Sequence, residues 1–154
     1  MLITKLTVKE LQQQMTKGHL TSEVLVKQAL QRIEQNTDYN AFITTDGLSA
    51  LAQAKHYDQL RAKGEIIGPL HGIPLAVKDN IHVAGLANTA GTPALHDFIP
   101  TTDAGVIRLM KAAGAIIIGK TNLHELAYGI TSNNKAYGSV KNAMDTRLFA
   151  GGSS

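Results

Sequence analysis

The chain has 154 residues, of which 44% are hydrophobic and 18% charged, and its net charge is +3. Abundant aliphatic residues and a small net charge exclude an intrinsically disordered chain, and the lack of cysteine excludes disulfides, a cysteine nucleophile and a cysteine-bound metal. No apolar run approaches the ~20 residues of a membrane span, and no basic run or aromatic cluster indicates direct nucleic-acid binding. We therefore expect one domain of a cytoplasmic protein, without membrane contact.

The first 67 residues are predicted to be mainly helical. Thr7 and Glu10 have the spacing of a capping box, which indicates the start of a helix. Apolar residues then recur at helical spacing within 21–36. A short strand separates this segment from a third helix, which is followed by Gly64. The elements expected here are helices over residues 7–17, 21–36 and 50–62 and a strand over 41–44.

The second part of the chain alternates strands and helices. Asp103 is a favourable N-cap, and the apolar residues that follow it form one stripe, namely Val106, Leu109, Met110 and Ala113. Asn122 and Glu125 are spaced as the cap of a short helix. The expected elements are strands over 73–77 and 115–118 and helices over 104–113 and 122–128. This alternation predicts an α/β fold.

One motif is misleading. Residues 114–121, GAIIIGKT, satisfy the pattern of the phosphate-binding P-loop. A P-loop needs a strand before its first glycine and a flexible loop between the two glycines. Here a helix is predicted before Gly114, and β-branched isoleucines, which resist positive φ, fill the gap. We interpret the segment as a helix end followed by a strand.

Two local features have both an ordinary and a functional interpretation. Lys78 ends an apolar strand, where a lysine is commonly a solvated surface residue. If buried at the carboxyl edge of a sheet, it would have a lowered pKa and would be a usable base. Residues 151–154, GGSS, fit either a flexible linker or a tight turn that presents a serine. The six histidines show no metal-ligand spacing.

The order of the motifs is more specific than any one of them. Residues 68–80, GPLHGIPLAVKDN, are followed by 113–127, by the segment 129–142 and by the glycine–serine run 151–154. This ordered set resembles the amidase signature family over essentially the whole chain, most strongly from residue 68 onward. The resemblance implies an α/β fold with a twisted mixed sheet flanked by helices. It implies that residues 1–154 are the N-terminal portion of a single amidase domain, truncated at the C-terminus. In this division, 1–67 is a helical lead-in and 68–154 carries the lysine and the serine pair.

The resemblance also implies a Ser–cis-Ser–Lys triad. Lys78 matches the neutral lysine base, and Ser153 matches the bridging serine that relays a proton beside a cis peptide bond. Thr131, Ser132 and Ser154 are candidates for substrate binding, although a loop capped by its own hydroxyls is an equal alternative for the first two. The attacking serine and the oxyanion-hole donors of the family follow the serine pair and have no counterpart in this chain.

The expected activity is hydrolysis of a linear carboxylic amide through an acyl-enzyme, without cofactor or metal. The 154 residues alone are expected to be inactive and to self-associate. Residues 122–134 look most like the aryl-acetamide hydrolases. The alternative is the glutamine-hydrolysing A subunit of a tRNA-dependent amidotransferase, which works with partner subunits. A scaffold or interaction module without catalysis stays open as another class. The expected partner is a small-molecule amide, and a homodimer also stays open.

Overall fold

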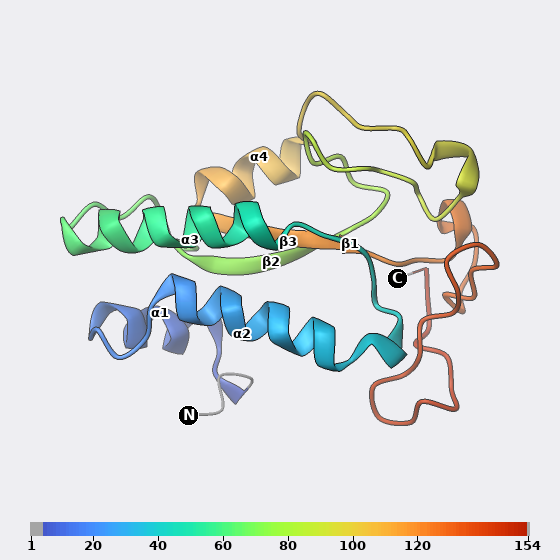
Figure 1. The fold of residues 1–154 in the computed structure, drawn as a ribbon, viewed down its shortest axis with the longest axis horizontal. Coiled ribbons are helices and arrows are strands. Elements are labelled where there is room, and N and C mark those ends of the chain that lie inside the picture. Colours follow the sequence, from blue (N-terminus) through green and yellow to red (C-terminus); the bar gives the residue numbers. More distant parts are fainter. Residues whose placement is uncertain (1–4, 154) are drawn as a thin grey trace. The chain divides into compact units, whose positions relative to one another are not determined.

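The computed structural model describes residues 5–153 (Figure 1). The α-helices are α1 (Val8–Thr16), α2 (Ser22–Gln35), α3 (Gly47–Ala62) and α4 (Gly105–Ala112). The strands are β1 (Phe42–Thr45), β2 (Ile73–Lys78) and β3 (Ala115–Thr121), and the short 3₁₀ helices are η2 (Thr37–Tyr39), η3 (Pro93–Leu95) and η4 (Glu125–Ala127). The predicted α/β class is confirmed.

The described chain divides into two compact units that interleave in sequence. The first comprises residues 5–32, 46–75 and 108–118, and the second comprises 33–45, 76–107 and 119–153. None of the helices in the described residues combines the length and the apolar run that a membrane span requires.

The three strands form a mixed sheet in the order β1-β3-β2. β1 is antiparallel to β3, with Phe42 opposite Thr121 and Thr45 opposite Gly119. Along β2 and β3 the residue numbers rise together: Leu70 N–H donates to the Ala113 carbonyl and Asp79 N–H to the Thr121 carbonyl. These two strands are therefore parallel, so Lys78 at the end of β2 lies at the carboxyl edge that they share.

α1 is capped as its local sequence predicts, whereas the first N–H groups of α2 bind a side chain of another helix. Thr7 and Glu10 form the expected capping box of α1. The main-chain N–H groups of Ser22 and Glu23, which open α2, donate to both oxygens of the Asp58 carboxylate in α3 at 2.7 and 2.9 Å. Figure 1 shows α2 and α3 running in opposite directions, which brings Asp58 to the start of α2.

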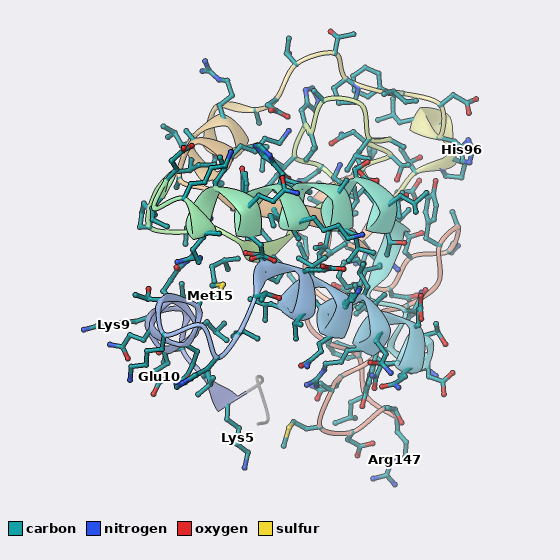
Figure 2. All side chains as sticks on the ribbon, turned by 60° about the vertical axis from the view of Figure 1, so that its left-hand side comes forward. Lys5, Lys9, Glu10, Met15, His96 and Arg147 are labelled. Atoms are coloured by element: carbon teal, nitrogen blue, oxygen red, sulfur yellow. The ribbon has the colours of Figure 1, made fainter. Side chains whose placement is uncertain are left out.

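The core of the first unit is aliphatic. In Figure 2, where α1 is seen end-on, Lys9 and Glu10 lie on its outer side and Met15 lies on the opposite side. Met15 packs in a buried cluster with Leu11, Leu20, Leu25 and Ile73, against which Leu6 and Leu70 also pack. The amphipathic pattern of α1 therefore fixes which side of the helix is buried.

Two expected features of the second half differ in the structure. In the predicted stripe of α4, Val106 is 47% and Leu109 72% exposed and Met110 and Ala113 are half-buried, whereas Ile107, outside the stripe, is buried. Apolar residues on this short helix cover two overlapping faces, and periodicity does not tell which one meets a neighbour.

The short helix predicted over 122–128 forms only over Glu125–Ala127. Only the 3₁₀ turn η4 forms, because Leu126 and Ala127 have left-handed φ values of 52° and 58°. The side chain of Asn122 does not cap Glu125; its oxygen accepts from Leu123 N–H at 2.8 Å. A local capping pattern is outweighed here by a turn that the tertiary structure uses for the site.

The segment that imitates a P-loop is a strand. Residues 115–121 form β3, three residues longer than predicted, and all but its last residue are buried. Gly114 ends the preceding helical turn with a φ of 93°. The residues between the two glycines are therefore extended, and they do not form a phosphate cradle.

Candidate active site

Lys78 and Ser153 lie together in the second unit. Lys78 is the last residue of β2, and its Nζ donates a hydrogen bond to Ser153 Oγ at 2.6 Å. The two residues are 75 positions apart in sequence, and both are half-buried. An amine in contact with a serine hydroxyl is the arrangement that lets a lysine exchange a proton with a serine.

Ser153 is fixed through its own backbone and that of its neighbours. The His124 N–H donates to the Ser153 carbonyl at 2.8 Å, and the Gly152–Ser153 peptide bond is cis. The Ser132 hydroxyl donates to the Gly151 carbonyl. A Cβ at Gly152 would lie 2.6 Å from the Ile130 carbonyl carbon, so only glycine permits this close approach.

An open depression adjoins Ser153. It has a volume of about 490 Å³ and is lined by Ala127, Tyr128, Gly129, Ile130 and Ser153. The side chains of Tyr128 and Ile130 are 91% and 81% exposed. The left-handed turn at 126–127 that replaces the predicted helix is thus what presents an aromatic and an aliphatic side chain beside the serine hydroxyl.

The other candidate site residues differ in their surroundings. Thr131 is half-buried, and its Oγ1 lies 3.4 Å from His124 Nδ1. Ser132 is completely buried, and its hydroxyl is engaged by Gly151. Ser154 lies outside the described residues. The structure therefore brings Lys78 and Ser153 into direct contact, with Thr131 and Ser132 in the adjoining loop.

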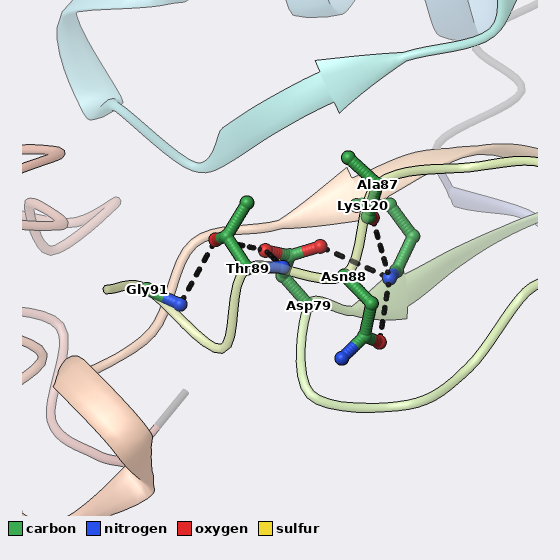
Figure 3. Close-up of polar contacts among 6 residues, drawn as sticks. All are labelled: Asp79, Ala87, Asn88, Thr89, Gly91 and Lys120. Carbon is green, nitrogen blue, oxygen red and sulfur yellow. Dashed lines mark hydrogen bonds and ion pairs between the residues drawn. The ribbon is translucent and has the colours of Figure 1, made fainter. Parts of the chain in front are cut away.

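A buried ion pair lies directly after Lys78 (Figure 3). Lys120 Nζ is 3.0 Å from Asp79 Oδ1, and both side chains are fully buried. Asp79 Oδ2 also accepts from Thr89, through its main-chain N–H at 2.9 Å and through its hydroxyl. Lys120 Nζ donates further to the Ala87 carbonyl at 3.2 Å and to Asn88 Oδ1 at 3.1 Å. Burial lowers the pKa of Lys120, and its hydrogen bond and attraction to Asp79 oppose that change.

Sequence reasoning missed this pair. In the sequence, Lys120 stands out only within the P-loop pattern, and Asp79 only as a neighbour of Lys78. The available signal was a lysine at the end of a continuous apolar strand, since buried charges in proteins are nearly always paired. Nothing in the sequence indicates which carboxylate is the partner.

No group of three or more histidine, aspartate or glutamate side chains with the geometry of a metal site occurs within residues 5–153. The groups that the described site brings together are the Lys78 amine, the hydroxyls of Ser153 and Thr131, and the His124 imidazole. Such a set can transfer protons between hydroxyls and an amine.

A family model described as Amidase matches residues 24–154. Mandelamide hydrolase from Pseudomonas putida is 49% identical over 156 residues, which cover 97% of this chain and 31% of that protein. The A subunit of glutamyl-tRNA(Gln) amidotransferase from Natranaerobius thermophilus is 43% identical over 155 residues, covering 100% of this chain and 32% of that protein.

Solved structures give the same result. A crystal structure of an amidase superposes with a TM-score of 0.90 at 37% identity, over 96% of this chain and 34% of that one. The native peptide amidase from Stenotrophomonas maltophilia superposes with a TM-score of 0.87 at 38% identity, over 94% and 31%. The chain thus spans about a third of the length of the curated relatives and solved structures that it matches. From the family model, these identities and the shared fold, the chain belongs to the amidase signature family.

Proposed function

We propose that the protein containing this chain hydrolyses a linear carboxylic amide, with Lys78 as the base and Ser153 as the proton relay. The observation that supports the proposal is the 2.6 Å contact between Lys78 Nζ and Ser153 Oγ. Residues 1–154 are then the N-terminal portion of a single amidase domain, with 68–154 contributing the lysine and the bridging serine. The attacking serine and the oxyanion-hole donors lie outside these residues.

In the proposed reaction, neutral Lys78 takes the Ser153 hydroxyl proton while Ser153 takes the proton of the attacking serine. That serine adds to the amide carbonyl, and the protons return along the same path to the leaving amine as the C–N bond breaks. A water molecule then gives a proton to the Ser153–Lys78 pair and adds to the acyl-enzyme carbonyl. The bond to the attacking serine breaks, that serine regains a proton, and the acid is released. A serine hydroxyl is a weak nucleophile until a base removes its proton, which is why the lysine is needed.

The proposed substrate is an aryl-acetamide. The 49% identity with mandelamide hydrolase supports this class, as do the exposed Tyr128 and Ile130 beside Ser153. Thr131, on the same loop, is proposed to face the polar part of the substrate. Aromatic and aliphatic side chains beside a reactive hydroxyl suit an apolar acyl group.

Glutamine is the second candidate substrate, because all of this chain aligns at 43% identity with 32% of an amidotransferase A subunit. Under this alternative the protein needs partner subunits. Ammonia release from mandelamide, phenylacetamide and glutamine by the full-length protein, with and without added amidotransferase subunits, separates the two. Release from glutamine only when the subunits are present would favour the alternative.

The role of Lys78 is tested by two substitutions in the full-length protein. Lys78→Ala removes the amine, and Lys78→Arg keeps a positive charge but cannot act as a base at neutral pH. We expect both to lower kcat by about 100-fold or more. Lys63→Ala, at an exposed position just after α3, is the matched control and is expected to retain activity.

Full activity of Lys78→Arg would contradict the proposal, because a lysine that only donates a hydrogen bond can be replaced by arginine. If the unsubstituted protein hydrolyses none of the three amides, the scaffold interpretation takes its place.

A further inference from the structure

The side chain of Asp79 anchors the strand end that carries Lys78. Asp79 N–H donates to the Thr121 carbonyl at 3.1 Å, and the Asp79 carbonyl accepts from Ala90 N–H at 3.0 Å. Its carboxylate is held by Thr89 and Lys120. Successive side chains of an extended segment point to opposite sides, so Lys78 reaches Ser153 while Asp79 enters the buried network.

Lys120 is held in a buried polar network beside Asp79. Its Nζ lies 3.0 Å from Asp79 Oδ1 and donates hydrogen bonds to the Ala87 carbonyl and to Asn88 Oδ1. The two side chains form an ion pair and are both fully buried. Each charge alone would act strongly on a neighbouring amine, whereas the pair largely cancels.

We propose that Asp79 and Lys120 are positioning residues for the amide hydrolysis assigned above. Their ion pair fixes the backbone that orients Lys78 toward Ser153. It also cancels the charge of the carboxylate that follows Lys78 in sequence, so that Lys78 can lose its proton and act as a base. This inference rests on the proposed function, because it concerns the protonation of the same lysine.

The charged and titratable groups on the segments that hold the Lys78–Ser153 contact are Asp79, Lys120, His124, Glu125 and Tyr128. Asp79 belongs to the same segment as Lys78, and Lys120 comes from β3, which pairs with β2. His124 precedes η4, and its main-chain N–H binds the Ser153 carbonyl. Of these groups, Asp79 and Lys120 form the buried ion pair, so their side chains are substituted singly and together.

The test is the pH profile of kcat/KM for four forms of the full-length protein: unsubstituted, Asp79→Asn, Lys120→Met, and the double variant. The acidic limb reports the loss of the Lys78 proton. Lys120→Met leaves a carboxylate that favours protonated Lys78, so this limb moves to higher pH by about one pH unit. Asp79→Asn removes the carboxylate together with the attraction that opposes the lowering of the Lys120 pKa by burial, so no unpaired charge is left and the limb stays in place. In the double variant the limb returns to its original position, while kcat stays lower by about ten-fold because the anchor is lost.

A shift in Lys120→Met that is absent from Asp79→Asn and from the double variant cannot come from a loss of structure alone, which would affect all three variants. If Lys120→Met folds and keeps the original limb, or if Asp79→Asn shifts the limb in the same direction, the inference is wrong. Lys78→Ala separates this failure from that of the proposed function: when the hydrolysis itself survives Lys78→Ala, the proposed function has failed.

Thr89→Val leaves Asp79 and Lys120 in place. Its kinetics therefore test the inference even if the variants of Asp79 and Lys120 do not fold. It removes the hydroxyl that donates to Asp79 while retaining the size of the side chain. We expect kcat to fall by about five-fold or more, with KM and the acidic limb unchanged. A kcat within about two-fold of the original protein would overturn the inference. His96→Gln, at an exposed position of the same unit, is the control for substitution in general.

Discussion

Ser132 has a left-handed backbone, with φ 53°, and a completely buried hydroxyl that donates to the Gly151 carbonyl. Removing this donor leaves the carbonyl two residues before Ser153 without its partner. We expect Ser132→Ala in the full-length protein to lower kcat by about ten-fold with little change in KM, because the serine loop loses its orientation. Steady-state kinetics on the preferred amide checks this.

Ser139→Ala is the matched control, since Ser139 lies in the same loop but is exposed, and its hydroxyl donates to the side chain of Asn133. A rise in KM at constant kcat for Ser132→Ala would instead indicate that Ser132 contacts the substrate.

His71 provides a prediction about stability at the residue scale. Its ring is fully buried and stacks on Tyr57; Nε2 lies 2.9 Å from the Tyr57 carbonyl, and Ile67 N–H donates to Nδ1. Burial lowers the pKa of His71, and the nearby Arg61 charge lowers it further, against the effect of the Tyr57 carbonyl. The unfolded chain therefore binds this proton at higher pH than the folded chain does. The stability that neutral His71 contributes is fully present above its pKa in the unfolded chain, 6.5. It is lost as the pH falls toward the lower pKa of His71 in the folded chain.

We expect the full-length protein to lose stability between pH 7 and 5, and His71→Gln to weaken that dependence. Denaturant midpoints across this pH range measure the effect. His56→Gln, at an exposed histidine of α3, should keep the original dependence. An unchanged slope in His71→Gln would show that other groups cause the pH effect.

At the scale of elements, the turn between α4 and β3 depends on a glycine. Gly114 has a φ of 93°, and a Cβ there would lie 2.6 Å from His71 Cα and 2.8 Å from His71 N. These are backbone atoms, and Gly72 N–H donates to the Gly114 carbonyl at 2.9 Å, so neither segment can move away without losing that bond. Gly64 has a similar φ of 80° but nothing within 4 Å of a Cβ.

A comparison of alanine substitutions at Gly64 and Gly114 separates the cost of a left-handed backbone from the cost of a steric clash. We expect Gly64→Ala to cost about 1 kcal/mol of unfolding free energy from the left-handed backbone alone. Gly114→Ala should cost at least about 2 kcal/mol more, because the clash is added to the same strain. Denaturant unfolding of the two full-length variants gives the difference. Equal losses of unfolding free energy in the two variants would mean that the backbone at His71 moves away from the added Cβ at little cost.

At the scale of the whole molecule, the 154-residue chain exposes large apolar side chains. Leu48, Leu109, Tyr128 and Ile130 are each more than 70% exposed. Two of the three strands, β1 and β2, have only one neighbour in the described sheet. Exposed apolar surface and free strand edges favour association. We expect the isolated chain to form concentration-dependent oligomers in sedimentation velocity, and a monomer at all concentrations would contradict this.

The same isolated chain is expected not to react with a serine-directed fluorophosphonate, because we propose that the attacking serine lies outside it. The full-length protein should be labelled, and Lys78→Ala in that protein should abolish labelling. Labelling of residues 1–154 alone that depends on Lys78 would place a nucleophile within this chain.

Local patterns in the sequence determined most of the elements. The capping box at Thr7, the apolar run of β3 and the strand ending at Lys78 depend on neighbours in sequence, so they were predicted to within a few residues. The contact of Lys78 with Ser153 did not follow from periodicity; it was expected only from the family resemblance, and the fold brings the two together. The buried face of α4, the left-handed turn before Tyr128 and the choice of Asp79 as partner of Lys120 were decided by tertiary structure alone. Each of these depends on which distant segment is close enough to exclude water or accept a hydrogen bond, and that information is not local to any stretch of sequence.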